Sequence, residues 1–207
     1  FLGEIVGPQV VQRFNVPAAV NGAKPNAVLA TAASGAAVLA IGYGETSAGT
    51  VELLRFDSAS MTWVTLLAGL SPPTVRGLQV DRDGNVLLVH SGGSGADRVV
   101  KARYYDATAS QWQAPFSLPA DATAVRLIAC SGGRAVIVAE SASQGGPLAI
   151  MRTPAGGWSG PAAMSEGPSD VVLAATLLDD GTLVYQIESP PTGGATPGPL
   201  SVRNLRA

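Results

Sequence analysis

Three glutamates occupy matching places in the sequence, where they could supply the carboxyl groups of a glycoside hydrolase. Glu45, Glu140 and Glu188 each lie at or just after an apolar run of strand length. His90 has the matching place in another run of this kind, 85–90. Hydrolysis of a glycosidic bond needs two carboxyl groups a few ångströms apart with different pKa values. The spacing alone does not show that any two of these carboxyl groups lie close together. A charged residue that ends a strand usually marks the point where the chain meets water.

Metal, nucleophile and phosphate sites have less support. The chain has one histidine and one cysteine, so no His/Cys cluster can form, which argues against catalytic zinc. Asp81 and Asp83 recur in part as Asp179 and Asp180, yet DRDG is too short for a calcium loop, and Asp-Gly is a common turn. The sequence contains no G-x-S-x-G elbow and no Lys-Ser/Thr phosphate loop. We therefore predict no metal, no cofactor and no catalytic triad.

A recurring turn identifies the elements that must position these residues. The segment VDRDGNVLLV (80–89) has the pattern of a strand, an Asp-Gly turn and a second strand. Similar segments recur at intervals of 49, 49 and 48 residues, measured between the turn glycines Gly35, Gly84, Gly133 and Gly181. A supersecondary unit written four times at one period indicates a repeat fold.

Each unit divides into four short runs of strand composition. In the second unit these are 76–81, 85–90, 99–106 and 111–119, separated by residues typical of turns. Four antiparallel strands recurring at one period are typical of a β-propeller blade. We predict an all-β fold, a single β-propeller domain over 1–207 with about four four-stranded blades. Its repeats cover approximately 27–70, 75–119, 124–164 and 171–207.

The fourth unit ends without the Trp-bearing strand of the others. The segment 10–20 matches 111–122, with Pro17 in the place of Pro119. We therefore predict that an N-terminal strand at 10–20 completes the last blade and closes the ring. The alternatives are a fragment of a larger propeller and two chains that share one ring.

Two strings resemble known propeller repeats. YDATASQW (105–112) and FDSASMTW (56–63) resemble the Tyr-Asp, spacer, Trp signature of kelch-like blades and the Trp-containing repeats of bacterial surface propellers, and more loosely the Asp-box turn. The kelch diglycine is absent, and Ser58 stands where an Asp box has its aspartate. The four-bladed count is similar to the haemopexin-like domain, whose disulfide cannot form with Cys130 alone. The resemblance implies a fold rather than an activity, and we interpret the recurring Trp as packing between blades.

The predicted site lies where the repeats differ most. These segments connect the second strand to the third and the fourth strand to the next unit, and the topology brings them to one rim of the ring. For each candidate below, a solvated loop residue is a simpler interpretation than a ligand-binding one. The ligand-binding candidates are Tyr43, Glu45, His90, Asp97, Arg98, Glu140, Gln144 and Glu188, with Arg76, Arg126 and Asp170 near the channel mouth.

Composition narrows the class of partner. Hydrophobic residues make up 46% of the 207 residues, and the net charge is −2, so we expect a substantial core and no surface for nucleic acid. The longest apolar runs have strand length, so we predict no membrane span. Cys130 lies in an apolar run, where an inert buried thiol is expected.

These observations together predict a non-enzymatic binding or assembly module that recognises a protein or a glycan through loops on one rim. Composition associates it with an extracellular or cell-surface, bacterial location. The start at Phe1, without a basic leader segment, is typical of a processed chain or an excised domain. A multivalent lectin with equivalent sugar sites between blades is one alternative, and a carbohydrate-active hydrolase is the other.

Overall fold

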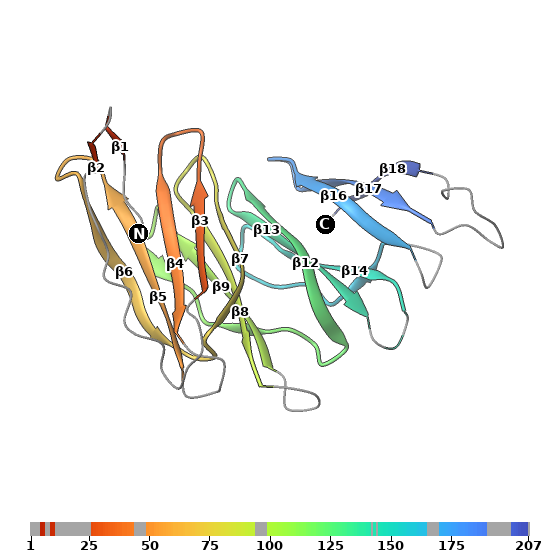
Figure 1. The fold of residues 1–207 in the computed structure, drawn as a ribbon. Helices are drawn as coiled ribbons and strands as arrows, with labels where there is room; N and C mark the ends of the chain where they lie inside the picture. Colours follow the sequence, from red (N-terminus) through yellow and green to blue (C-terminus); the bar gives the residue numbers. More distant parts are fainter. Residues whose placement is uncertain are drawn as a thin grey trace.

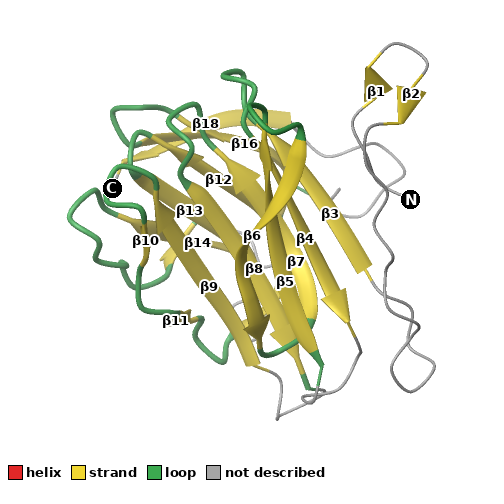
Figure 2. Cartoon of the chain, turned by 90° about the vertical axis from the view of Figure 1, so that its left-hand side faces the viewer, coloured by secondary structure: helices red, strands yellow, loops and turns green. Residues whose placement is uncertain are grey.

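The structure is a computed structural model that describes residues 5–6, 9–10, 26–43, 49–93, 99–141, 143, 145–164, 170–189 and 200–206. The regular elements in these residues are strands, arranged as four antiparallel sheets of three to five strands and one two-stranded hairpin (Figure 1, Figure 2). The predicted all-β propeller architecture is confirmed. In this part of the chain no helix is long and apolar enough to cross a membrane.

Each sheet follows the chain, and we number the sheets as blades 1 to 4. Blade 1 consists of β3 (Asn26–Thr31), β4 (Ala37–Tyr43), β5 (Thr50–Asp57) and β6 (Thr62–Leu70). Blade 2 consists of β7 (Thr74–Val80), β8 (Val86–Gly92), β9 (Val99–Asp106) and an outer strand in two pieces, β10 (Gln111–Trp112) and β11 (Phe116–Ser117). Blade 3 consists of β12 (Ala122–Ser131), β13 (Arg134–Ser141), β14 (Pro147–Arg152) and β15 (Ala162–Ala163). Blade 4 consists of β16 (Val171–Leu177), β17 (Thr182–Glu188) and β18 (Leu200–Arg206).

The blades stand in a row, and the described strands leave the row open. Successive inner strands β3, β7, β12 and β16 pack on one another, whereas β3 and β16 lie at opposite ends (Figure 1). The hairpin of β1 (Ile5–Val6) and β2 (Gln9–Val10) lies at the blade 1 end, where Val10 pairs with Ile5. The rest of the predicted closing strand 10–20 lies outside the described residues, so closure by this segment stays a prediction.

The turn between the first two strands of each blade has the geometry that its glycine implies. The four turn glycines have φ values of 87°, 85°, 75° and 89°, where a residue with a Cβ is strained. In blade 2 the Asp81 N–H donates to the Asn85 carbonyl at 3.0 Å and the Gly84 N–H donates to the Asp81 carbonyl at 3.1 Å, and blades 1 and 4 repeat this pair. We call this side of the row the turn rim, and the opposite side the loop rim.

Apolar side chains fill the space between neighbouring blades. Leu87 and Val89 of blade 2 pack with Ile137 and Ile150 of blade 3, and all four are fully buried. Successive side chains of a strand point to opposite faces, so Leu88, next to Leu87, packs towards blade 1 instead. Every blade therefore has one face for the preceding blade and one face for the following blade.

The three tryptophans each pack against an apolar cluster. They are partly buried, and their rings lie 5.0–5.4 Å from other aromatic rings, in the pairs Phe56–Trp63, Tyr105–Trp112 and Phe116–Trp158. The last pair joins blade 2 to blade 3 with nearly parallel rings. The interpretation of the recurring Trp as packing between blades therefore holds for Trp112 and Trp158, which pack against clusters that join two blades. Among the described residues, Trp63 packs within blade 1 instead.

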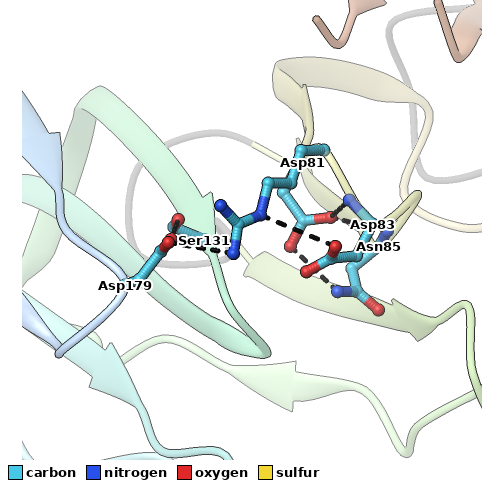
Figure 3. A network of polar contacts seen from close by, with 6 residues as sticks. Asp81, Asp83, Asn85, Ser131 and Asp179 are labelled. Carbon is cyan, nitrogen blue, oxygen red and sulfur yellow. Dashed lines mark hydrogen bonds and ion pairs between the residues drawn. The ribbon is translucent and has the colours of Figure 1, made fainter. Parts of the chain in front are cut away.

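The turn rim holds a buried carboxylate that organises the blade 2 turn (Figure 3). Asp81 is 5% exposed. It accepts hydrogen bonds from the N–H groups of Asp83 and Asn85, at 3.0 and 2.9 Å, and from the Asn85 side-chain amide at 2.9 Å. The Asn85 amide oxygen in turn accepts from the Ala107 N–H at 3.0 Å. Asp81 therefore stabilises the turn of blade 2.

A second contact on the turn rim links blades that are not neighbours. Arg82 of blade 2 reaches Asp179 of blade 4, with 3.0 Å between Nη2 and Oδ2, and Ser131 of blade 3 donates a hydrogen bond to the same carboxylate (Figure 3). The described residues include no group of three or more His, Cys, Asp or Glu side chains that could hold a metal ion. The carboxylates of Asp81 and Asp179 thus accept hydrogen bonds from other groups of the protein.

Candidate functional site

The inner strands of blades 2, 3 and 4 each contain a β-bulge at the same place. The pairing between first and second strands skips one residue there, and the skipped residues are Arg76, Arg126 and Leu173. The pairing of β3 with β4 in blade 1 has no such irregularity. A bulge leaves its extra residue unpaired and re-aims the side chain. All three bulged residues are exposed, so adjacent inner strands present two guanidinium groups near the loop rim.

Each bulged arginine bonds a residue at the end of the second strand in its own blade. Arg126 donates hydrogen bonds to Glu140 from Nε, at 2.7 Å, and from Nη2. Both side chains of this ion pair are about half exposed. Arg76 donates from Nε to the Ser91 hydroxyl at 2.6 Å. These charge-assisted bonds fix the orientation of groups at the rim.

The partners of the arginines belong to a set of equivalent positions. Ser91, Glu140 and Glu188 each lie seven residues after the turn glycine of their blade. Glu188 is half-buried and, within the described part of the chain, forms no ion pair or side-chain hydrogen bond. Blade 1 has Gly42 at this position, where a Cβ would lie 2.1 Å from the Pro73 carbonyl oxygen. Two neighbouring blades therefore place a carboxylate at the same height on one rim.

His90 lies beneath the rim instead of on it. The side chain is fully buried, its Nδ1–H donates to the Pro72 carbonyl at 2.7 Å, and its Nε2 accepts from Arg103 at 3.3 Å. Burial lowers the pKa of His90 to about 4; the Pro72 carbonyl opposes this effect, and the nearby charges of Arg103 and Lys101 add to it. His90 is thus a neutral histidine that joins blade 2 to the preceding connection.

A further carboxylate joins two connections at the loop rim. Asp121, just before blade 3, accepts hydrogen bonds from the Ser141 hydroxyl at 2.6 Å and from the Ser143 N–H at 2.7 Å. It holds the entry to blade 3 against the connection that follows β13. Asp121 therefore stabilises the surroundings of Glu140, one residue before Ser141.

The remaining sequence candidates are scattered. The Tyr43 hydroxyl donates to Glu52 at 3.5 Å, and burial together with the Glu52 carboxylate raises the pKa of Tyr43. Asp170 is half-buried immediately before β16. The candidates outside the described residues are Glu45, Asp97, Arg98 and Gln144.

Arg126 and Glu140 were both predicted from the sequence, but their pairing was not, and neither Ser91 nor Asp121 was predicted. The seven-residue distance from the turn glycine could have grouped Ser91 with Glu140 and Glu188. Asp121 had no such signal, because its role depends on a contact with a loop about 20 residues away.

Comparisons with known proteins concern the fold. No protein-family model matches the sequence, and no curated protein matches it. Among solved structures, the hydrazine synthase of Kuenenia stuttgartiensis matches over 73% of this chain and 48% of its own, with a TM-score of 0.51 and 8% identity. The GH93 α-L-arabinofuranosidase of Fusarium graminearum matches over 88% and 62%, with a TM-score of 0.49 and 11% identity. The α-L-arabinanase of Penicillium chrysogenum matches over 86% of this chain and 62% of its own, with a TM-score of 0.48 and 12% identity.

This chain therefore spans about half to three fifths of the length of the structures that it resembles. At such low identity the likeness concerns the fold. The prediction of a non-enzymatic module is nevertheless wrong on this comparison, because the matching structures are enzymes.

Proposed function

We propose that the chain is a carbohydrate-active hydrolase whose site lies on the loop rim, around Glu140 and Glu188. The observation that carries the proposal is their equivalence: they end the second strands of neighbouring blades, so the repeat sets both at one height on one rim. Enzymes that hydrolyse glycosidic bonds commonly use two carboxyl groups on either side of that bond. The partner in this proposal is a glycan.

The unequal surroundings of the two glutamates suit unequal roles. Arg126 donates two hydrogen bonds to Glu140 and so fixes the orientation of its carboxylate, as a base or nucleophile requires. Glu188 has no cation beside it in the described part of the chain, so we assign it the role of the general acid. Arg126 is then a positioning residue for Glu140.

The other side chains of the rim support the site. Asp121 ties together the connections beside Glu140. Arg76 and Ser91 repeat the arginine pair one blade earlier, where their donors could bind a sugar hydroxyl. An extracellular location and the kelch-like character of the repeats remain part of the proposal, and the arabinofuranosidase and arabinanase above make arabinan a reasonable first substrate.

The proposal is tested by assaying the purified chain for new reducing ends on arabinan and on a panel of neutral and acidic polysaccharides. We expect hydrolysis of one class of glycan. Glu140→Gln and Glu188→Gln should each lower the rate at least 100-fold, because each removes a carboxyl group while keeping the side-chain size. Asp83→Asn is the matched control, since it makes the same change on the exposed turn rim.

Two results would overturn the proposal. One is the absence of hydrolysis on every glycan of the panel with a chain that is folded by circular dichroism. The other is hydrolysis that continues undiminished in both glutamine variants, which would place the reaction elsewhere on the molecule.

A further inference from the structure

We propose that Lys101 and Arg103 of β9, beside the buried ring of His90, form a binding site for an oxyanion where blade 2 meets blade 1. The ligand is a compact anionic group with oxygen acceptors, either a free phosphate or sulfate or the carboxylate of an acidic sugar. The proposal is independent of the hydrolase function, because it concerns binding at blades 1 and 2 rather than the two glutamates of blades 3 and 4.

The three basic side chains lie together on one face of blade 2. His90 and its pairing partner Lys101 lie opposite each other on β8 and β9, so their side chains point to the same side of the sheet. Arg103 lies two residues after Lys101 and points to that side as well. Its own partner, Leu88, packs in the apolar cluster between blades 1 and 2, so this side faces blade 1.

Contacts with the imidazole place both cations close to His90. Arg103 donates from Nε to Nε2 of His90 at 3.3 Å. Besides burial, the charges of Arg103 and Lys101 lower the pKa of His90. Two positive groups are therefore gathered around one buried, neutral ring.

No acidic side chain balances these cations in the part of the chain that the structure describes. The ion pairs there involve Arg82 and Arg126, and neither Lys101 nor Arg103 takes part in one. Both Lys101 and Arg103 are half-buried, and burial lowers the pKa of Arg103. A cation that has lost part of its hydration is costly unless an opposite charge compensates it. An oxyanion taken from solvent would supply that charge.

Blade 3 shows that the fold does not require basic residues at these three places. The equivalent residues, matched by their distance from the turn glycine and by their pairing, are Ala139, Leu148 and Ile150. All three are at most 3% exposed and belong to the apolar cluster between blades 2 and 3. The repeat thus fills this junction with apolar side chains in one case and with three basic side chains in the other. Such an exchange points to a ligand instead of a packing role.

The donors of the pair suit an oxyanion. The Nε of Arg103 faces His90, so the two Nη groups form the part of the planar fork that a ligand would meet. Lys101 adds an ammonium group on the same face of the same strand. A guanidinium fork with a point charge beside it binds carboxylate, sulfate and phosphate groups. Because both side chains are only half-buried, a ligand can reach them from solvent.

His90 provides the first test, because it is the only histidine of the chain and therefore gives a single signal beside the site. The experiment is a titration of the full chain, with isotope-labelled histidine, by NMR at neutral pH. The probes are inorganic phosphate, sulfate and oligogalacturonate. An anion on Arg103 changes the bond from Nε to the ring, so we expect the Nε2 signal to shift and to saturate. Chloride at the same ionic strength is the control for screening.

Two variants locate the binding. Arg103→Gln should weaken it about tenfold or more, and Lys101→Gln about threefold, since the first removes the fork and the second a point charge. Arg55→Gln is the matched control, because it removes the same charge from an exposed position of blade 1. Circular dichroism checks that each variant is folded.

Thermal unfolding provides a second measurement that does not depend on the histidine signal. A ligand that binds the folded chain raises its unfolding midpoint. Phosphate should therefore raise the midpoint of the native chain and of Arg55→Gln more than chloride does at equal ionic strength. The same addition should have a smaller effect on Arg103→Gln.

The probes also identify the source of the oxyanion. A response to phosphate and sulfate as well as to oligogalacturonate would assign the site to oxyanions in general. A response to the oligosaccharide alone would assign it to the carboxylate of a sugar chain.

Two results would overturn the proposal. One is a His90 signal that shifts no further with any of the three probes than with chloride. The other is binding that keeps the affinity of the native chain in both Arg103→Gln and Lys101→Gln, which would place the anion elsewhere.

Discussion

The two rims of the blade row are built from the same four repeats but use their polar residues differently. On the turn rim, Asp81 is buried and accepts three hydrogen bonds from its own turn. On the loop rim, bulges expose Arg76 and Arg126, which bond side chains at the strand ends. Asp81 thus stabilises the fold on one rim, whereas Arg76 and Arg126 are exposed to solvent on the other.

The largest effect should come from the buried carboxylate of the turn rim. Asp81→Ala removes the acceptor of two backbone N–H groups and one amide, so we expect a loss of about 3 kcal/mol in the free energy of unfolding. Urea denaturation measures this loss. Asp83→Ala in the same turn is the control, because that side chain is about half exposed and should matter little. A loss below about 1 kcal/mol for Asp81→Ala would contradict the comparison.

The buried histidine near the loop rim should make stability depend on pH. The pKa of His90 is about 4 in the folded chain and ordinarily 6.5, so between these values the unfolded chain binds a proton that the folded chain does not. Stability should be complete above pH 6.5 and fall by up to about 3 kcal/mol as the pH drops towards 4.

Denaturation midpoints at several pH values, compared between the native chain and His90→Asn, isolate this contribution. The asparagine amide can still donate to the Pro72 carbonyl but does not titrate. An equally steep decline in both proteins between pH 6.5 and 4 would show that other groups cause it.

A smaller effect is expected where blade 1 lacks a side chain on the loop rim. Gly42→Ala would place a Cβ 2.1 Å from the Pro73 carbonyl oxygen, so the connection must move, at a cost of about 2 kcal/mol. Thermal unfolding measures the change. Gly160→Ala serves as the control, since no atom lies within 4 Å of its new Cβ. Equal stability of both variants would mean that this connection yields freely.

The smallest effect should come from the exposed ion pair of the turn rim. Arg82 and Asp179 are more than half exposed, so Arg82→Ala should cost less than about 1 kcal/mol, and less still at high salt. Urea denaturation at low and high salt checks this expectation. A larger, salt-independent loss would mean that the contact matters to the fold as much as Asp81 does.

The sequence predicted the strands and turns well because their signals are local. The predicted strand 99–106 coincides with β9, and the recurring glycines have the positive φ that their turns require. The bulges at Arg76 and Arg126 could not be predicted, because they depend on the register between two strands. His90 was predicted on the rim because it lies next to a glycine-rich loop. In the structure its side chain is buried and bonds the Pro72 carbonyl, a contact that the sequence does not indicate.

The reach of Arg82 from blade 2 to blade 4 has a consequence for movement of the blades. One side chain can join these two turns only if blades 2, 3 and 4 lie close together on the turn rim, where Arg82, Ser131 and Asp179 meet. Any spreading of the three blades on that rim must break contacts to the Asp179 carboxylate, so these two bonds report directly on the width of the row.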